Sequence, residues 1–246
     1  MAGLREIRNR IKSVKNTKKT TYAMKLGSAT KLRKAQEAVE LSRDYTNALG
    51  ALVARIAREQ QDANFEHPLL QERSVVKRVA LIVVGGNRGL CGAYNSNVSR
   101  ALDAFLTEHA DKEVDIYALG RKPAEHCRKL EVECKETYEE LGDDPNTWPL
   151  QDIMNQAEDE FLVGNVDAVY VIYTKFRSAM SMSVESSQLL PVNADALIAE
   201  SEEIAGSEQS GSVLFEPSPS EVFLSIVPRI VSGKMRQACL DAKAGE

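Results

Sequence analysis

Residues 3–59 read GLREIRNRIKSVKNTKKTTYAMKLGSATKLRKAQEAVELSRDYTNALGALVARIARE, and no proline interrupts them. Apolar side chains recur along this stretch at steps of three and four, a spacing that predicts one long helix with an apolar seam. Such a helix would be about 80 Å long, so much of its seam would extend beyond a single small domain and need something to pack against. The seam consists of Leu4, Ile7, Ile11, Val14, Met24, Leu32, Ala35, Val39, Tyr45, Leu49, Leu52 and Ile56.

The charges of this stretch differ from those of the rest of the chain. Twelve basic and three acidic residues between Met1 and Arg43 give it a net charge of +9. The whole chain carries −5, which leaves −14 for the remaining residues. A basic helix on an acidic body predicts an anionic partner surface. A solvated coiled-coil face is the alternative interpretation, because lysine-rich helix faces are common.

Composition excludes several classes of protein. No run of eighteen apolar residues is present, so no membrane-spanning segment is expected. The basic N-terminus lacks the apolar core and cleavage site of a secretory signal. Three scattered histidines predict no metal site. The four cysteines lack C-x-x-C spacing and are expected to be reduced thiols; they are Cys91, Cys127, Cys134 and Cys239.

Beyond Pro68, which ends the long helix, strands alternate with helices. This order predicts an α/β domain with a mostly parallel sheet, fused to a long N-terminal coiled-coil helix and followed by a C-terminal helix. The last strand can be antiparallel to its neighbour. The expected divisions are a shaft helix at 1–67, the α/β domain at 68–212 and a C-terminal helix from 213 to 246. Strands are expected at 77–84, 114–119, 132–137, 166–174 and 180–190.

A glycine-rich stretch, GGNRGLCGAYNSN at 85–97, links the first strand to a helix. Such a turn can hold phosphate on backbone N–H groups, but the glycine spacing matches neither common nucleotide-binding pattern. A tight turn with close helix–strand packing is favoured, and Cys91 within it is expected to be packed. Asp143 and Asp144 lie in an expected loop, where solvated acids are the default. The sequence offers no combination of a nucleophile, a general base and an oxyanion-binding site. No catalytic residue and no cofactor are therefore predicted.

Several motifs in order carry a resemblance over nearly the whole chain. They are LREIRNRIKSVKNTKKTTYAMKLGSATKLRKAQ at 4–36, GNRGLCGAYNSNV at 86–98, IYTKFRSAMS at 172–181, SQLLP at 187–191 and FEPSP at 215–219. Together they resemble the gamma subunit of F-type ATP synthases. The resemblance implies a central-stalk rotor inside a ring of alpha and beta subunits. It also implies contact with the epsilon subunit and the c-ring, where proton flow drives rotation. A gamma chain of this kind catalyses nothing itself and lies peripherally on the cytoplasmic face of the bacterial inner membrane.

Seven residues match positions at which the resemblance implies contact with other subunits. Met24 and Lys25 fall in the shaft segment that faces acidic loops of the beta subunits. The other shaft residues are Arg33 and Lys34, and the residues matched to the patch near the c-ring are Leu214, Phe215 and Glu216.

The family continues past this chain's last residues into a further helical segment, so the C-terminal helix is expected to lack its second half. Three explanations stay open: a truncated, non-coupling gamma chain, a second polypeptide that supplies the missing segment, or a shaft that is a single helix. A nucleic-acid-binding protein that uses the basic helix on phosphates is the rival hypothesis. An enzyme with a nucleotide in the glycine-rich turn is the third.

Overall fold

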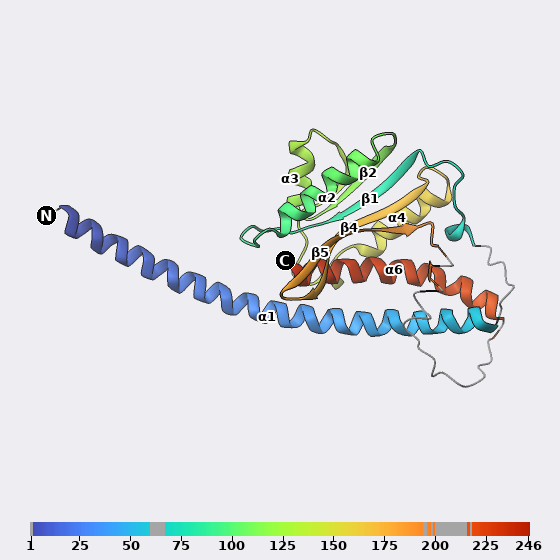
Figure 1. The fold of residues 1–246 in the computed structure, drawn as a ribbon, viewed down its shortest axis with the longest axis horizontal. Helices are drawn as coiled ribbons and strands as arrows, with labels where there is room; N and C mark the ends of the chain where they lie inside the picture. The colour runs from blue at the N-terminus through green and yellow to red at the C-terminus, as the bar shows by residue number, and fades with distance from the viewer. Residues whose placement is uncertain (1, 60–66, 194–195, 198, 200–215, 217) are drawn as a thin grey trace. The chain divides into compact units, whose positions relative to one another are not determined.

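The structure is a computed structural model that describes residues 2–59, 67–193, 196–197, 199, 216 and 218–246. Its first element, α1, is an unbroken helix over Ala2–Glu59, as the seam predicts (Figure 1). The short 3-10 helix η1 (Pro68–Leu70) follows, with Pro68 at its start. The chain divides into two compact units, Met1–Ala38 and Val39–Glu246.

The second unit is built on a five-stranded sheet in the order β3-β2-β1-β4-β5. The first four strands in the chain are parallel, and β5 pairs antiparallel with β4 through a tight turn. The prediction of a mostly parallel sheet is therefore confirmed. The strands are β1 (Arg78–Val84), β2 (Glu113–Leu119), β3 (Cys134–Tyr138), β4 (Ala168–Ser178) and β5 (Ser181–Leu190).

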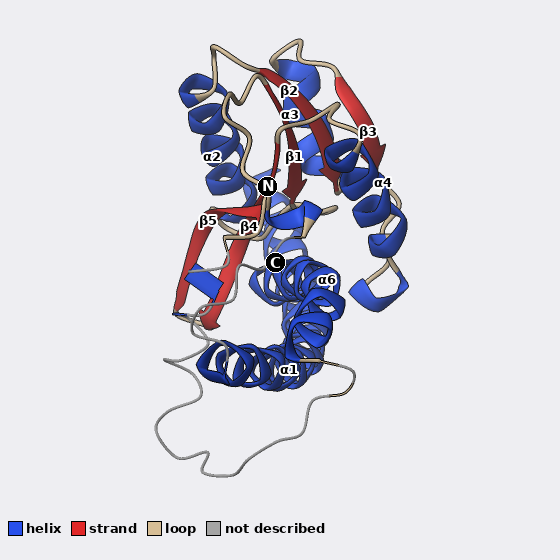
Figure 2. Cartoon of the chain, turned by 90° about the vertical axis from the view of Figure 1, so that its right-hand side faces the viewer, coloured by secondary structure: helices blue, strands red, loops and turns tan. Residues whose placement is uncertain are grey.

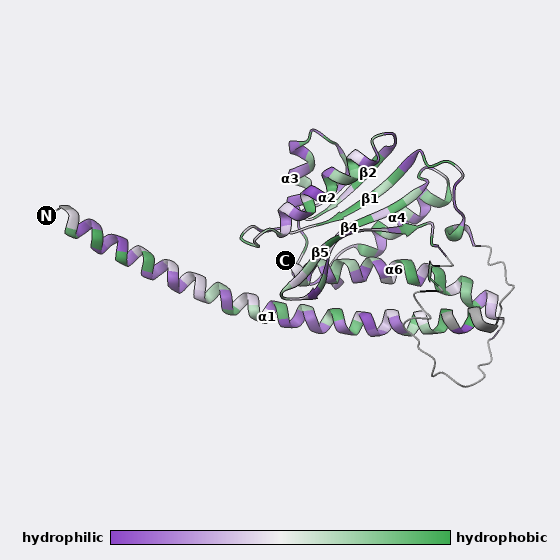
Figure 3. Ribbon diagram, in the orientation of Figure 1, coloured by the Kyte–Doolittle hydropathy of each residue, from purple (hydrophilic) through white to green (hydrophobic). Residues whose placement is uncertain are grey.

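Helices cover both faces of this sheet, and Figure 2 shows α2 and α4 on opposite sides of it. Six of the seven residues of β1 are buried, because both of its faces are covered. This is why the strand is a continuous apolar run, visible in green in Figure 3, rather than an alternating one. The covering helices are α2 (Tyr94–Glu108), α3 (Arg121–Lys129), α4 (Leu150–Leu162) and α6 (Pro219–Gly245).

The start of α6 is set by local sequence. Ser218 is the N-cap, and its hydroxyl accepts a hydrogen bond from the Glu221 backbone N–H at 3.2 Å. Pro219 occupies the first helical position, where its missing N–H costs nothing. The helix continues through Pro228 to Gly245.

Within the second unit, the last part of α1 joins the core on the side of α4 and α6. Val39, Val53 and Ile56 are at most 2% exposed. The seam predicted from the sequence is wrong at Tyr45, which is 52% exposed, and it missed Val53. The true buried line drifts around the helix, because 3.6 residues per turn does not match a strict repeat of three and four.

Candidate interaction surface

In the first unit, the apolar seam of α1 is exposed to solvent. The described residues from Gly3 to Lys31 are all exposed. A series of large apolar side chains on one helix, each about half exposed or more, is unusual for a surface that stays in water. The residues are Leu4 (67%), Ile7 (57%), Ile11 (50%), Val14 (62%), Tyr22 (63%), Met24 (49%) and Leu26 (54%).

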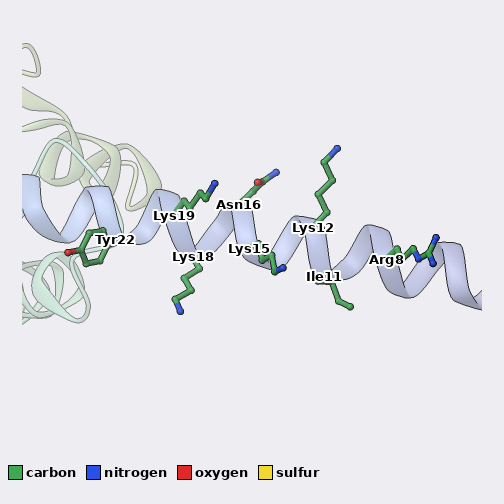
Figure 4. A pocket seen from close by; sticks show the side chains of 8 residues that line it. All are labelled: Arg8, Ile11, Lys12, Lys15, Asn16, Lys18, Lys19 and Tyr22. Atoms are coloured by element: carbon green, nitrogen blue, oxygen red, sulfur yellow. The ribbon is translucent and has the colours of Figure 1, made fainter.

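Basic side chains alternate with these apolar ones. Figure 4 shows eight residues that line a shallow depression along this helix: Arg8, Ile11, Lys12, Lys15, Asn16, Lys18, Lys19 and Tyr22. Lys12 and Lys19 leave the helix on one side, and Lys18 leaves it on the other. The side chains do not converge on one point, so the arrangement suits an extended macromolecular partner better than a small molecule.

Carboxylates of the chain itself are scarce along this surface. Glu6 is the one acid between Met1 and Gln36 in the sequence. Further along, Arg33 pairs with Glu37 at 3.1 Å across one helical turn, with both side chains largely exposed. Such an exposed pair contributes little to stability. The carboxylates of the first unit are therefore too few to balance its positive charge, which suits a negatively charged partner.

Threonine hydroxyls in the same unit are turned toward the backbone of their own helix. Thr17 donates to the Ser13 carbonyl at 3.1 Å, and Thr30 donates to the Leu26 carbonyl at 3.1 Å. Thr20 and Thr21 make the same contact one turn back. These bonds satisfy the hydroxyls locally. These threonines therefore present their methyl groups among the exposed cations and apolar side chains of the surface.

The seven residues predicted from the resemblance have different outcomes. Met24 is 49% exposed, and Lys25, Arg33 and Lys34 are exposed on the same helix, so all four are accessible. Glu216 is also exposed. Two of the predicted residues, Leu214 and Phe215, lie outside the described residues.

The glycine-rich turn is a packing element. A Cβ on Gly85 would lie 2.5 Å from Pro123 of α3, so only glycine allows this close approach of strand and helix. Gly86 donates its N–H to the Asn95 side chain at 3.1 Å. Gly85 also donates its N–H to the Leu119 carbonyl at 2.9 Å, and the close approach at Gly85 fits the tight-turn interpretation.

Polar residues around this turn hold the loop in shape. Cys91 is half-buried, and its sulfur accepts a hydrogen bond from the Asn95 side chain at 3.0 Å. Tyr94 is buried and donates its hydroxyl to the Ala242 carbonyl at 2.9 Å, which ties α2 to α6. Burial raises the pKa of the Tyr94 hydroxyl well above its ordinary range. Such a hydroxyl stays protonated and acts as a hydrogen-bond donor.

The two aspartates considered as acid–base candidates have structural partners. Asp143 forms an ion pair with Lys243 of α6 at 3.3 Å. Asp144 caps the 3-10 helix η2 (Pro145–Thr147) and accepts from the Asn146 backbone at 2.9 Å. Among the residues that the structure describes, no three His, Cys, Asp or Glu side chains gather as metal ligands. In the same part of the chain, no helix is long and apolar enough to cross a membrane.

Sequence reasoning missed the polar contact that anchors α1 in the second unit. Arg43 was counted as part of the outward basic face. Its guanidinium instead reaches inward, where it lies 3.3 Å from the buried Asp241 carboxylate of α6 and donates to the Phe176 carbonyl of β4. The Arg43 side chain is 42% exposed and that of Asp241 is 3% exposed. One side chain therefore joins three elements.

Comparison with known proteins agrees with the resemblance. A family model described as ATP synthase matches residues 3–246. The ATP synthase gamma chain of Xanthomonas axonopodis pv. citri (strain 306) is 36% identical over 248 residues, which cover 100% of this chain and 83% of the relative. The ATP synthase gamma chain of Desulfitobacterium hafniense (strain DSM 10664 / DCB-2) is 35% identical over 246 residues, with the same two coverages.

A solved structure supports the fold independently. The central stalk and c-ring structure of the Tetrahymena thermophila mitochondrial ATP synthase contains a chain with a TM-score of 0.60 and 18% identity to this one. The match covers 92% of this chain and 93% of that chain. The fold is thus retained at low identity, while the curated relatives share well over 30% of their residues across the whole of this chain. The chain therefore belongs to the ATP synthase gamma chain family.

Proposed function

We propose that this gamma chain is the central-stalk rotor of a proton-translocating F-type ATP synthase, and that residues 1–38 are the part of the shaft held by the alpha and beta subunits. The chain is a non-catalytic subunit of that complex. The observation that carries the proposal is the exposed face of α1, where apolar side chains that are about half exposed or more alternate with cations from Leu4 to Leu26.

The chemistry of this face suits a rotating contact. Exposed ion pairs each contribute roughly 0–1 kcal/mol, and the apolar side chains are spread along the helix rather than gathered in one deep patch. A shaft that made a few strong contacts would be held at one angle. Many weak contacts with carboxylates and apolar surfaces of the surrounding subunits lower the barrier between one angular position and the next.

Within this face, Met24 and Lys25 are the residues that we propose to face acidic loops of the beta subunits, with Arg33 and Lys34 nearby. The exposed, unbranched side chain of Lys25 can pair with such carboxylates at several angles. Leu214, Phe215 and Glu216 are proposed to contact the c-ring. The α/β sheet domain would then lie against the epsilon subunit, peripheral to the cytoplasmic face of the bacterial inner membrane.

Reconstitution with alpha and beta subunits tests the proposal. Lys25→Glu reverses one charge of the proposed face, and Lys129→Glu makes the same change on an exposed position of α3. We expect Lys25→Glu to weaken assembly roughly fivefold, since about 1 kcal/mol is at stake for an exposed pair, and to lower the rates of ATP hydrolysis and rotation. The Lys129→Glu chain should assemble like the unchanged chain.

Two outcomes would refute this assignment. One is equal behaviour of the two variants in assembly and rotation. The other is a chain that never associates with alpha and beta subunits but binds DNA with a steep salt dependence, as the nucleic-acid hypothesis requires.

A further inference from the structure

Two of the four free cysteines lie together at one edge of the second unit, far along the chain from the proposed shaft. Cys127 is in the last turn of α3 and is 1% exposed. Cys134 is the first residue of β3 and is half-buried. Both pack against the same apolar cluster between the sheet and α2.

The backbone between the two cysteines folds back toward α3. Two N–H groups, those of Leu130 and Val132, donate to the Cys127 carbonyl at 3.1 and 3.0 Å. Glu131 between them has a φ of 57°, so the chain reverses immediately after the helix. The start of β3 therefore returns alongside the end of α3. Burial, together with the contact with the Cys134 side chain, raises the pKa of the Cys127 thiol to about 12.

We propose that Cys127 and Cys134 form an oxidation site, at which a small-molecule disulfide of the glutathione type converts the two thiols into an intramolecular disulfide between α3 and β3. The half-buried sulfur of Cys134 is the point of entry, and the enclosed Cys127 is the resolving thiol. The other two cysteines lie elsewhere: Cys91 in the glycine-rich turn and Cys239 in the opposite core cluster.

The reaction balances in two exchange steps. The Cys134 thiolate attacks one sulfur of the small disulfide, which breaks its S–S bond, forms a mixed disulfide and releases one small thiolate. The Cys127 thiolate then attacks the Cys134 sulfur, forms the protein disulfide and releases the second small thiolate. The protein loses two hydrogens, and the small disulfide is reduced to two thiols.

Burial raises the pKa of the Cys127 thiol, so we expect the second step to be slow at neutral pH. Below the pKa of that thiol, its thiolate fraction rises about tenfold for each pH unit. We expect the rate of ring closure to rise by the same factor between neutral and mildly alkaline pH. The mixed disulfide on Cys134 should accumulate first and then decay into the cross-link.

The experiment treats the folded chain with oxidised glutathione and quenches the reaction with acid. The chain is then unfolded, its free thiols are alkylated and it is digested with trypsin. Trypsin cleaves after Arg128 and Lys129, between the two cysteines, so the disulfide joins two separate peptides. We expect the folded chain to give the cross-linked pair of peptides. The mass of this pair should be two hydrogens lower than the summed masses of the two reduced peptides. The urea-unfolded chain should instead give a mixture of pairings.

Variants separate the two roles. Cys127→Ser should stop at the mixed disulfide on Cys134, and Cys134→Ser should leave Cys127 unmodified. The matched control, Cys91→Ser, should retain the full cross-link. The proposal is overturned if Cys127 is recovered as a free thiol after Cys134 has been fully modified in the folded, unchanged chain. It is also overturned if Cys134 pairs with Cys91 instead.

Discussion

The contact between Arg43 and Asp241 gives the sharpest test of how α1 is held in the second unit. The Asp241 carboxylate is 3% exposed, and the Arg43 guanidinium that pairs with it reaches in from a side chain that is 42% exposed. Removing one partner of a buried pair leaves the other charge uncompensated. The two partners therefore should not respond equally to substitution.

For Arg43→Met we expect the free energy of unfolding to fall by about 3 kcal/mol, the lower end of the range for breaking a buried ion pair, because Arg43 is partly in water. Asp241→Asn should stay within about 1 kcal/mol of the unchanged chain, since a neutral amide keeps the shape and needs no counter-charge. The double variant should recover most of the loss. A coupling of about 2 kcal/mol between the positions would result.

The pH dependence follows from the carboxyl group. Burial raises the pKa of Asp241, although the neighbouring Arg43 acts in the opposite direction. A raised pKa in the folded state means that the ionised form costs stability above that pKa, and that the cost disappears as the pH falls through it. The deficit of Arg43→Met should therefore shrink in mildly acidic solution. No such recovery is expected for a variant that also carries Asp241→Asn.

Urea unfolding can be followed by the fluorescence of Trp148, the single tryptophan, which packs against the core cluster next to α6. Arg33→Met is the matched control, because the Arg33 side chain is 83% exposed and pairs with Glu37 on the same helix. Arg33→Met should lower the free energy of unfolding by at most about 0.5 kcal/mol. Equal losses for Arg33→Met and Arg43→Met would refute the reasoning.

Three further substitutions test the fold and the shaft, each by urea unfolding or circular dichroism. Gly120→Ala should lower the free energy of unfolding by more than about 2 kcal/mol, because Gly120 has a φ of 107° and a Cβ there would lie 2.3 Å from the Gly85 carbonyl oxygen. A variant as stable as the unchanged chain would contradict this packing. Tyr94→Phe should lower the free energy of unfolding by about 1 kcal/mol, because the hydrogen bond to the Ala242 carbonyl is lost. An unchanged free energy of unfolding would show that this bond does not stabilise α6. Gly27→Ala should stabilise the helix by about 1 kcal/mol, because alanine favours helix more than glycine does and a Cβ at this position meets no atom of this chain within 4 Å. A loss of helicity on circular dichroism would contradict this expectation.

The element order could be predicted from the sequence because its local signals agree. Continuous apolar runs mark β1 and the first half of β4, where most residues are buried, and the glycine-rich turn after β1 marks the close approach of α3. The antiparallel pairing of β5 with β4 agrees with the expectation that the last strand can be antiparallel to its neighbour.

Residues that act through distant partners could not be predicted. Arg43 and Asp241 are 198 positions apart, and a count of basic residues cannot separate a cation that points inward from one that points outward. Cys127 and Cys134 lack C-x-x-C spacing, and only the chain reversal at Glu131 brings them together. Tyr45 and Val53 were misjudged because steps of three and four fit more than one line along a helix.

The same helix thus carries one kind of side chain in two environments. Val39 and Ile56 are buried, whereas Leu4, Ile7 and Val14 are more than half exposed, although all five are aliphatic and belong to the same predicted seam. A helix is costly to start and cheap to extend, so the anchored part, with Arg43 on Asp241, can nucleate the rest of α1. Loss of that anchor should therefore lower the helicity of the first unit as well as the stability of the second, so that helicity would connect the rotor surface to Asp241, which is far from it in the sequence.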